Sequence, residues 1–156
     1  MRFFSIFLSV ALAMTLWGCD KNSNNSNSCT PTTDAENDAA MQAYMTANGI
    51  TGTKDPSGMY YQVLAEGTGN KPTINSRVTV NYTGKLTDGT VFDKGSNVAF
   101  LVSQVVVGWQ IGLTKVAKGG KIKLVIPPNL GYGCKGSSPI PGNAVLAFDV
   151  DILDVK

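Results

Sequence analysis

The feature that most restricts the fold is a regular alternation of apolar and polar residues in the C-terminal two thirds of the chain. The alternation recurs in four separate segments, at residues 59–63, 78–83, 121–126 and 146–153. Successive side chains of a β-strand point to opposite faces of a sheet, so a period of two collects the apolar residues on one face. The segments therefore predict an antiparallel sheet with one buried face and one solvated face. Asp88-Gly89 between Leu86 and Val91 is typical of a tight turn within that sheet.

One segment of the same region has a helical period instead. The apolar residues Val105, Val106, Trp109 and Leu113 form a single stripe when the stretch from Gln104 to Leu113 is drawn as a helix. One short helix laid on an antiparallel sheet is an α+β arrangement. Because only this helix covers the buried face, we expect a shallow apolar pocket between helix and sheet.

A second helix is predicted before the sheet, over residues 34–49. Thr33 and Glu36 have the spacing of a capping box, and Asn48-Gly49 is a typical C-terminal stop. The helix either lies on its own domain or pairs with a second copy as the arm of a homodimer. Its sequence leaves both arrangements open.

The first 18 residues have the pattern of an export signal. Met1-Arg2 is positively charged, and residues 3–16 are almost entirely apolar. This run is too short to span a bilayer comfortably, and the polar stretch after it offers no partner to a buried helix. Residues 16–19, Leu-Trp-Gly-Cys, resemble the bacterial lipoprotein box, which implies a lipidated Cys19; an ordinary soluble export signal is the alternative. Residues 19–33 are predicted to form a flexible tether, since their Asn- and Ser-rich sequence has little to bury.

Composition excludes several classes of function. The chain has no histidine, so the commonest general base and metal ligand is missing, and its three cysteines lack the paired spacing of a zinc site. The net charge is only +2 and the lysines are scattered, whereas nucleic-acid binding needs a clustered basic face. We therefore expect no metal, no cofactor and no nucleic-acid partner.

Four strings in the C-terminal region are similar to those of the FKBP family of immunophilins. They occur in family order within residues 59–156, at 80–93, 100–109, 126–133 and 140–150. The resemblance implies a half-barrel of antiparallel strands wrapped around one short helix, preceded here by the helix at 34–49. It also implies peptidyl-prolyl cis–trans isomerase activity on proline-containing polypeptides, without a cofactor.

The resemblance also implies a set of site residues. Its catalytic members fall on Tyr82, Phe92, Asp93, Trp109, Tyr132 and Phe148, and its substrate-binding members on Val98, Val105, Val106 and Ile140. Trp109 would form the floor of the pocket, while Tyr132 and the backbone of Val106 would bind a peptide or a macrolide. Val98 takes the place of an aromatic wall residue that many members have.

Two functions fit this site. The first is a folding enzyme for exported proteins, lipid-anchored in a bacterial envelope membrane and facing the periplasm or the cell surface. The second is a non-catalytic peptide-binding chaperone or adaptor with the same fold.

In an oxidising compartment Cys29 and Cys134 either form a disulfide, tying the tether to the pocket rim, or stay as free thiols. The sequence alone does not decide between these last two states.

Overall fold

The structure is a computed structural model that describes residues 29–156. The predicted signal peptide 1–18, the lipidation residue Cys19 and residues 20–28 of the predicted tether lie outside the described residues. The elements in chain order are α1 (Asp34–Ala47), β1 (Thr53–Lys54), β2 (Tyr60–Ala65), β3 (Arg77–Leu86), β4 (Val91–Leu101), the 3-10 turn η1 (Val102–Gln104), α2 (Val107–Leu113), β5 (Lys121–Ile126), the 3-10 turn η2 (Pro128–Leu130) and β6 (Leu146–Val155). None of the helices in residues 29–156 has the length and apolarity needed to cross a membrane.

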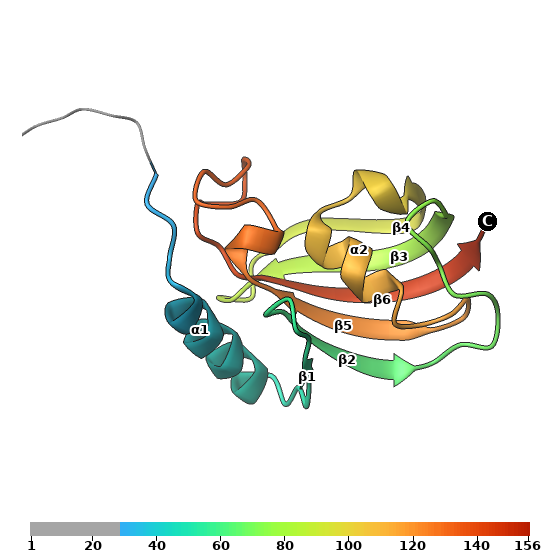
Figure 1. Cartoon of the computed structure of the whole chain (residues 1–156), viewed down its shortest axis with the longest axis horizontal. Coiled ribbons are helices and arrows are strands. Elements are labelled where there is room, and N and C mark those ends of the chain that lie inside the picture. Colours follow the sequence, from blue (N-terminus) through green and yellow to red (C-terminus); the bar gives the residue numbers. More distant parts are fainter. Residues whose placement is uncertain (1–28) are drawn as a thin grey trace, which may run out of the picture.

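The strands form one curved sheet in the order β1-β2-β5-β6-β3-β4, in which all neighbouring strands are antiparallel. The sheet curls around α2, and α1 precedes it, as Figure 1 shows. The predicted α+β half-barrel with an N-terminal helix is therefore confirmed. The alternation did not identify β4, because its middle is polar and its pairing with β3 shifts register twice. Such bulges interrupt the period of two on which the prediction depends.

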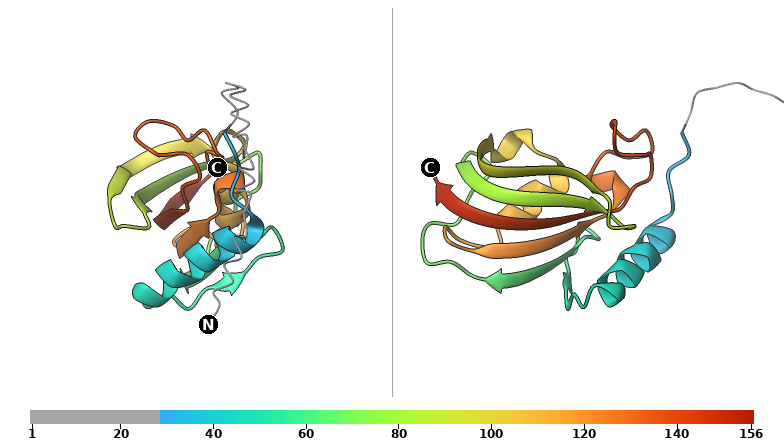
Figure 2. Two further views of the ribbon diagram at one scale, coloured as in Figure 1. Left: turned by 90° about the vertical axis from the view of Figure 1, so that its left-hand side faces the viewer. Right: turned by 180° about the vertical axis from the view of Figure 1, so that it is seen from behind.

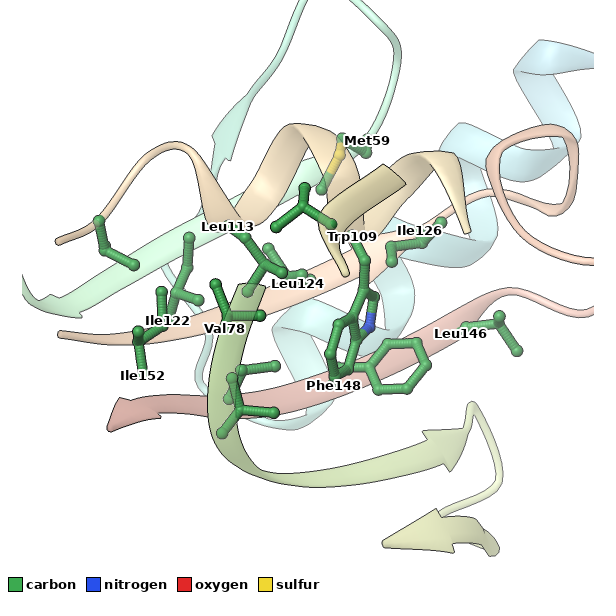
Figure 3. Packing of buried hydrophobic residues seen from close by; sticks show 14 of the residues in the cluster. Met59, Val78, Trp109, Leu113, Ile122, Leu124, Ile126, Leu146, Phe148 and Ile152 are labelled. Atoms are coloured by element: carbon green, nitrogen blue, oxygen red, sulfur yellow. The ribbon is translucent and has the colours of Figure 1, made fainter. Parts of the chain in front are cut away.

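The main core lies between α2 and the concave face of the sheet (Figure 3). Two glycines of α2 allow this close approach. A Cβ atom on Gly108 would come within 2.5 Å of Ile126, and one on Gly112 within 2.5 Å of Leu124. The helix begins at Val107, later than the predicted Gln104, so Val105 and Val106 lie in the extended segment that leads into it.

A second cluster lies on the opposite face of the sheet, under α1. It contains Met41, Met45, Tyr60, Val125 and Val145. Val125 is an exception to the solvated face that the alternation predicts, because α1 covers it and leaves it 1% exposed. Figure 2 shows α1 at the end of the sheet away from the C-terminus. The buried methionines of α1 thus pack on their own domain.

Candidate functional site

A pocket of about 290 Å³ opens between α2, β3, β4 and the loop that follows β5. Its lining residues are Tyr82, Phe92, Asp93, Phe100, Gln104, Val105, Val106, Trp109, Tyr132 and Phe148. Six of these ten are aromatic, so the walls are apolar with a few polar groups at the edge. This composition is typical of a site for a small apolar group.

The floor of the pocket is Trp109, which is 4% exposed and lies in the first turns of α2. Its ring meets those of Tyr82 and Phe148 edge to face, with centroids 5.3 and 5.2 Å away. Phe100 completes the group at 5.8 Å. Flat rings at right angles hold one another firmly and leave a hollow where they diverge. Figure 3 shows the indole beside the ring of Phe148.

The indole Nε1 of Trp109 is buried and has no hydrogen-bond partner within the described protein. A buried donor without a partner costs about 1–3 kcal/mol. Buried polar groups are nearly always paired, so this unpaired donor calls for a specific explanation, of which a role at a functional site is one.

One wall depends on a glycine in β3. A Cβ atom on Gly84 would lie 2.7 Å from the rings of both Phe92 and Phe148. These two rings pack edge to face with centroids 5.5 Å apart. Strands β4 and β6, which carry them, pair with β3 on either side, directly opposite or next to Gly84. The absence of a side chain at residue 84 therefore leaves the space that the rings of Phe92 and Phe148 occupy.

A polar pair lies at the edge of the pocket. The hydroxyl of Tyr82 donates a hydrogen bond of 2.8 Å to the carboxylate of Asp93. Desolvation of the phenol, followed by this hydrogen bond, raises the pKa of Tyr82 to about 12. Tyr82 therefore stays a protonated donor at any physiological pH. Gly95, opposite Tyr82 in β4, leaves space for its ring, since a Cβ atom there would lie 2.6 Å from it.

Tyr132 lies at the entrance of the pocket, in the loop between η2 and β6, and is 41% exposed. It is close enough to Tyr82 to add to the rise of that residue's pKa. The loop is joined to the N-terminal segment by a disulfide between Cys29 and Cys134. The structure thus contains the pairing that the sequence left undecided.

The pocket brings together most of the predicted site residues. The eight that line it are Tyr82, Phe92, Asp93, Val105, Val106, Trp109, Tyr132 and Phe148. Ile140 and Val98 lie outside the lining. Ile140 is 7% exposed and belongs to the main core, and Val98 pairs with Val80 in the sheet. Neither residue lines the pocket, so a part in substrate binding would have to be exerted through neighbouring residues.

Two lining residues were missed in the sequence. Phe100 belongs to one of the family strings, and its ring packs on those of Tyr82 and Trp109. Its place two residues after Val98 in a strand could have indicated the same face. Gln104 lies at the end of η1, where no period predicts the direction of its side chain.

A larger depression of about 480 Å³ lies elsewhere on the sheet, lined mainly by polar residues of β3, β4 and β6. It includes Asn81, Thr83, Lys94, Asp149 and Asp151. Its only aromatic lining residue is Tyr82, and ion pairs already join Asp149 to Lys123 and Asp151 to Lys121. The smaller aromatic pocket is therefore the better candidate. In residues 29–156 no group of acidic, cysteine or histidine side chains is arranged to hold a metal ion.

Comparison with known proteins agrees with this geometry. Residues 68–153 match the family model of the FKBP-type peptidyl-prolyl cis-trans isomerases. The FKBP-type peptidyl-prolyl cis-trans isomerase FkpA of Escherichia coli K12 is 48% identical over 104 residues, which are 64% of this chain and 38% of that protein. The chain spans about half the length, or less, of the curated relatives it matches.

Solved structures give the same result. The crystal structure of FkpA from Escherichia coli has a TM-score of 0.71 and 42% identity, over 79% of this chain and 61% of that chain. A peptidyl-prolyl cis-trans isomerase from Pseudomonas syringae has a TM-score of 0.68 and 30% identity, over 81% of this chain and 98% of that chain. Family model, sequence relatives and fold agree, and the chain therefore belongs to the family of FKBP-type peptidyl-prolyl cis-trans isomerases.

Proposed function

We propose that this chain is a peptidyl-prolyl cis–trans isomerase that assists the folding of exported proteins. The observation that carries the proposal is the aromatic pocket over Trp109, with the Tyr82–Asp93 hydrogen bond at its edge. The pocket has the size and apolar character for a proline ring and a few polar groups for the adjoining peptide.

The reaction requires only rotation about one bond. Amide resonance opposes this rotation with a barrier of about 18–20 kcal/mol. Twisting removes the resonance, so the amide loses part of its charge separation. An apolar pocket disfavours the polar planar amide relative to the twisted one, and each 1.4 kcal/mol of this preference, roughly, accelerates rotation tenfold. No nucleophile, metal or cofactor has to take part.

The pocket residues would share this task. Trp109, Phe92 and Phe148 would hold the proline ring in the apolar hollow. Tyr132 at the entrance would donate a hydrogen bond to a carbonyl of the bound peptide. The Tyr82–Asp93 pair would orient the twisted amide, and the raised pKa of Tyr82 keeps its donor in place across physiological pH. The same pocket would take a macrolide as a competing ligand.

A protease-coupled assay on a proline peptide tests the proposal. The double variant F92A/D93A removes an apolar wall and the acceptor of Tyr82, so kcat/KM should fall by about a hundredfold or more, the size of losing two such contacts. The exposed Val91 begins the same strand, and Val91→Ala should retain full activity. Equal turnover in the double variant and the wild type would contradict the assignment.

The alternative is a binding module without turnover. In that case the wild type would suppress aggregation of an unfolded protein, yet leave the cis–trans rate of the peptide at its uncatalysed value. The intact aromatic lining favours the enzyme over this alternative.

We further propose export and lipid anchoring at Cys19. The Cys29–Cys134 disulfide supports an oxidising compartment, since such bonds are rare in the cytosol. The test is the mass of the chain recovered from bacterial membranes. Lipidation predicts a chain beginning at Cys19 with added acyl mass, and a Cys19→Ser variant that leaves the membrane fraction.

A homodimer through α1 stays a proposal of lower rank. Met41 and Met45 are already buried against their own domain, so a dimer would have to use the exposed side of the helix. Light scattering of the protein in detergent-free buffer, after removal of the signal peptide, would give a monomer mass if α1 serves only its own domain.

A further inference from the structure

Two segments far apart in the sequence are fastened to each other beside the pocket. We call residues 29–32 the strap and residues 131–145 the rim loop, which carries Tyr132. The disulfide from Cys29 to Cys134 joins them across 105 residues of sequence. Three residues further along the strap, the backbone N–H of Thr32 donates to the side-chain oxygen of Asn143, at 3.3 Å. The side-chain nitrogen of Asn143 donates in turn to the carbonyl of Thr30, at 2.9 Å.

The part of the rim loop that carries Tyr132, residues 131–139, has no buried side chain; the buried residues of the loop, Ile140 and Val145, come after it. The rim loop contains no helix and no strand of the main sheet, only an isolated bridge between Ser137 and Ile140. Tyr132 is 41% exposed, so core packing does not decide the position of its ring. A loop with few buried apolar contacts and exposed hydrogen bonds opens easily unless it is held by other means.

The strap holds the loop at the two points that matter for Tyr132. Cys134 is two residues from Tyr132 along the chain. The backbone N–H of Asn143 donates to the carbonyl of Gly133, the residue directly after Tyr132, at 3.0 Å. Asn143 also has a φ of 59°, a left-handed conformation that side chains other than Asn and Asp rarely adopt. The side chain of Asn143 is thus hydrogen-bonded to the strap, while its backbone is hydrogen-bonded to Gly133, next to Tyr132.

We propose that the strap is a positioning device for the pocket, which holds the hydroxyl of Tyr132 where the substrate needs it through Cys29, Cys134 and Asn143. This inference rests on the proposed function, and it adds positioning residues that do not touch the substrate. With the strap detached, the rim loop samples more conformations, and Tyr132 spends less time in position to donate its hydrogen bond.

Reduction of the full chain in detergent provides the first test. The two thiols of dithiothreitol lose two electrons and two protons and close to a cyclic disulfide. The Cys29–Cys134 disulfide accepts these two electrons and two protons and becomes two thiols. We expect kcat/KM to fall about fivefold on reduction, the effect of one lost hydrogen bond. The variant C29S/C134S should match the reduced wild type and should not respond to dithiothreitol.

A thermodynamic cycle separates positioning from general stabilisation. In Tyr132→Phe the hydroxyl is already absent, so reduction should leave kcat/KM unchanged within error. A strap that only stabilises the fold would lower activity by the same factor in both backgrounds, and that result would overturn the proposal. Asn143→Gly retains the backbone conformation and the disulfide but loses both side-chain hydrogen bonds. It should lower kcat/KM in the wild type and not in the Tyr132→Phe background.

Hydrogen exchange gives a readout that does not depend on turnover. Reduction should accelerate exchange in peptides covering residues 131–143, where the amides of Gly133, Gly136 and Asn143 are hydrogen-bonded, and should leave β5 and β6 unchanged. If the wild type shows no turnover at all, the proposed function fails, and hydrogen exchange of the rim loop is then the measurement that tests the strap. Unchanged exchange after complete reduction, checked by alkylation and mass, would refute it, as would free thiols at Cys29 and Cys134 in the exported protein.

Discussion

The two faces of the sheet near β5 bury apolar side chains in opposite ways. On the concave face, α2 and the sheet enclose rigid aromatic rings that meet edge to face and leave a pocket of about 290 Å³. On the other face, α1 covers a small cluster with Met41 and Met45, which are 2% and 8% exposed. Neighbouring residues of one strand divide between the two clusters, with Leu124 in the first and Val125 in the second.

The difference lies in the shape and stiffness of the side chains. A methionine has three rotatable bonds and fills an irregular gap, so Met41 and Met45 are almost fully buried under α1. The depression of about 230 Å³ that lies beside the helix is lined mainly by polar residues. Aromatic rings with two torsions cannot collapse into the space between them, and the hollow stays open. Substitutions under α1 should therefore change stability, and substitutions at the pocket should change turnover.

The largest effect is expected under α1. Met41→Ala should lower the free energy of unfolding by about 2–4 kcal/mol, because it leaves a cavity beneath the helix. Met41→Leu conserves the volume and should cost less than about 1.5 kcal/mol. Denaturant unfolding measures both values. A kcat/KM of folded Met41→Ala well below that of the wild type would contradict the separation of the two faces.

Adding a methyl group in the wall of the pocket should give the next largest effect, a loss of turnover. Gly84→Ala places a methyl group against Phe92 and Phe148, which must move apart or into the hollow. Overpacking of this kind costs about 2 kcal/mol, and the same loss at the transition state lowers kcat/KM roughly thirtyfold. Thr83→Ala, at the neighbouring position of β3, is the control and should retain activity. Turnover in Gly84→Ala equal to that of Thr83→Ala would show that this wall does not shape the reaction.

An ion pair between the turn before β2 and the segment after α2 should make stability depend on acid pH. A 2.7 Å hydrogen bond from Lys115, just after α2, and a weaker one from the N–H of Ser57 lower the pKa of Asp55 to about 2, against the effect of its burial. The unfolded value is near 3.8. A lowered folded pKa stabilises the protein above the unfolded value, and this contribution is lost as the pH falls from about 4 to 2.

We expect this loss to amount to about 1–2 kcal/mol. Urea unfolding at pH 5, 4, 3 and 2 measures it, and Asp55→Asn should remove that part of the pH dependence. If the wild type and Asp55→Asn show parallel curves, the carboxylate is not held as the structure indicates.

The smallest effect is expected at the edge of the pocket. Tyr82→Phe keeps the ring against Trp109 but loses the hydrogen bond to Asp93, so kcat/KM should fall about fivefold, or roughly 1 kcal/mol. Tyr44→Phe makes the same chemical change next to the α1 cluster and should leave turnover unaltered. Equal kcat/KM values for Tyr82→Phe and Tyr44→Phe in the proline peptide assay would disprove the role of Tyr82.

Much of the site could be predicted from local sequence because its residues lie in short strings. Tyr82 and Asp93 lie on either side of a tight turn, and Trp109 lies in the first turn of a short helix. Each falls within a family string, so the resemblance implies all three. Phe100 also lies in a family string, but the alternation did not identify its strand, because β4 is polar in its middle and its pairing with β3 shifts register twice. Gln104 lies in η1, where no period predicts the direction of its side chain.

The sequence by itself determined the antiparallel sheet, the short helix over it and the family to which the chain belongs. These follow from periods and strings that extend over few residues. Tertiary structure alone decided that α1 covers Val125, that Ile140 joins the core, and that Cys29 meets Cys134. Each of these joins segments distant in the chain. Such contacts depend on how strands pair and curl in three dimensions, and no local pattern of residues encodes that.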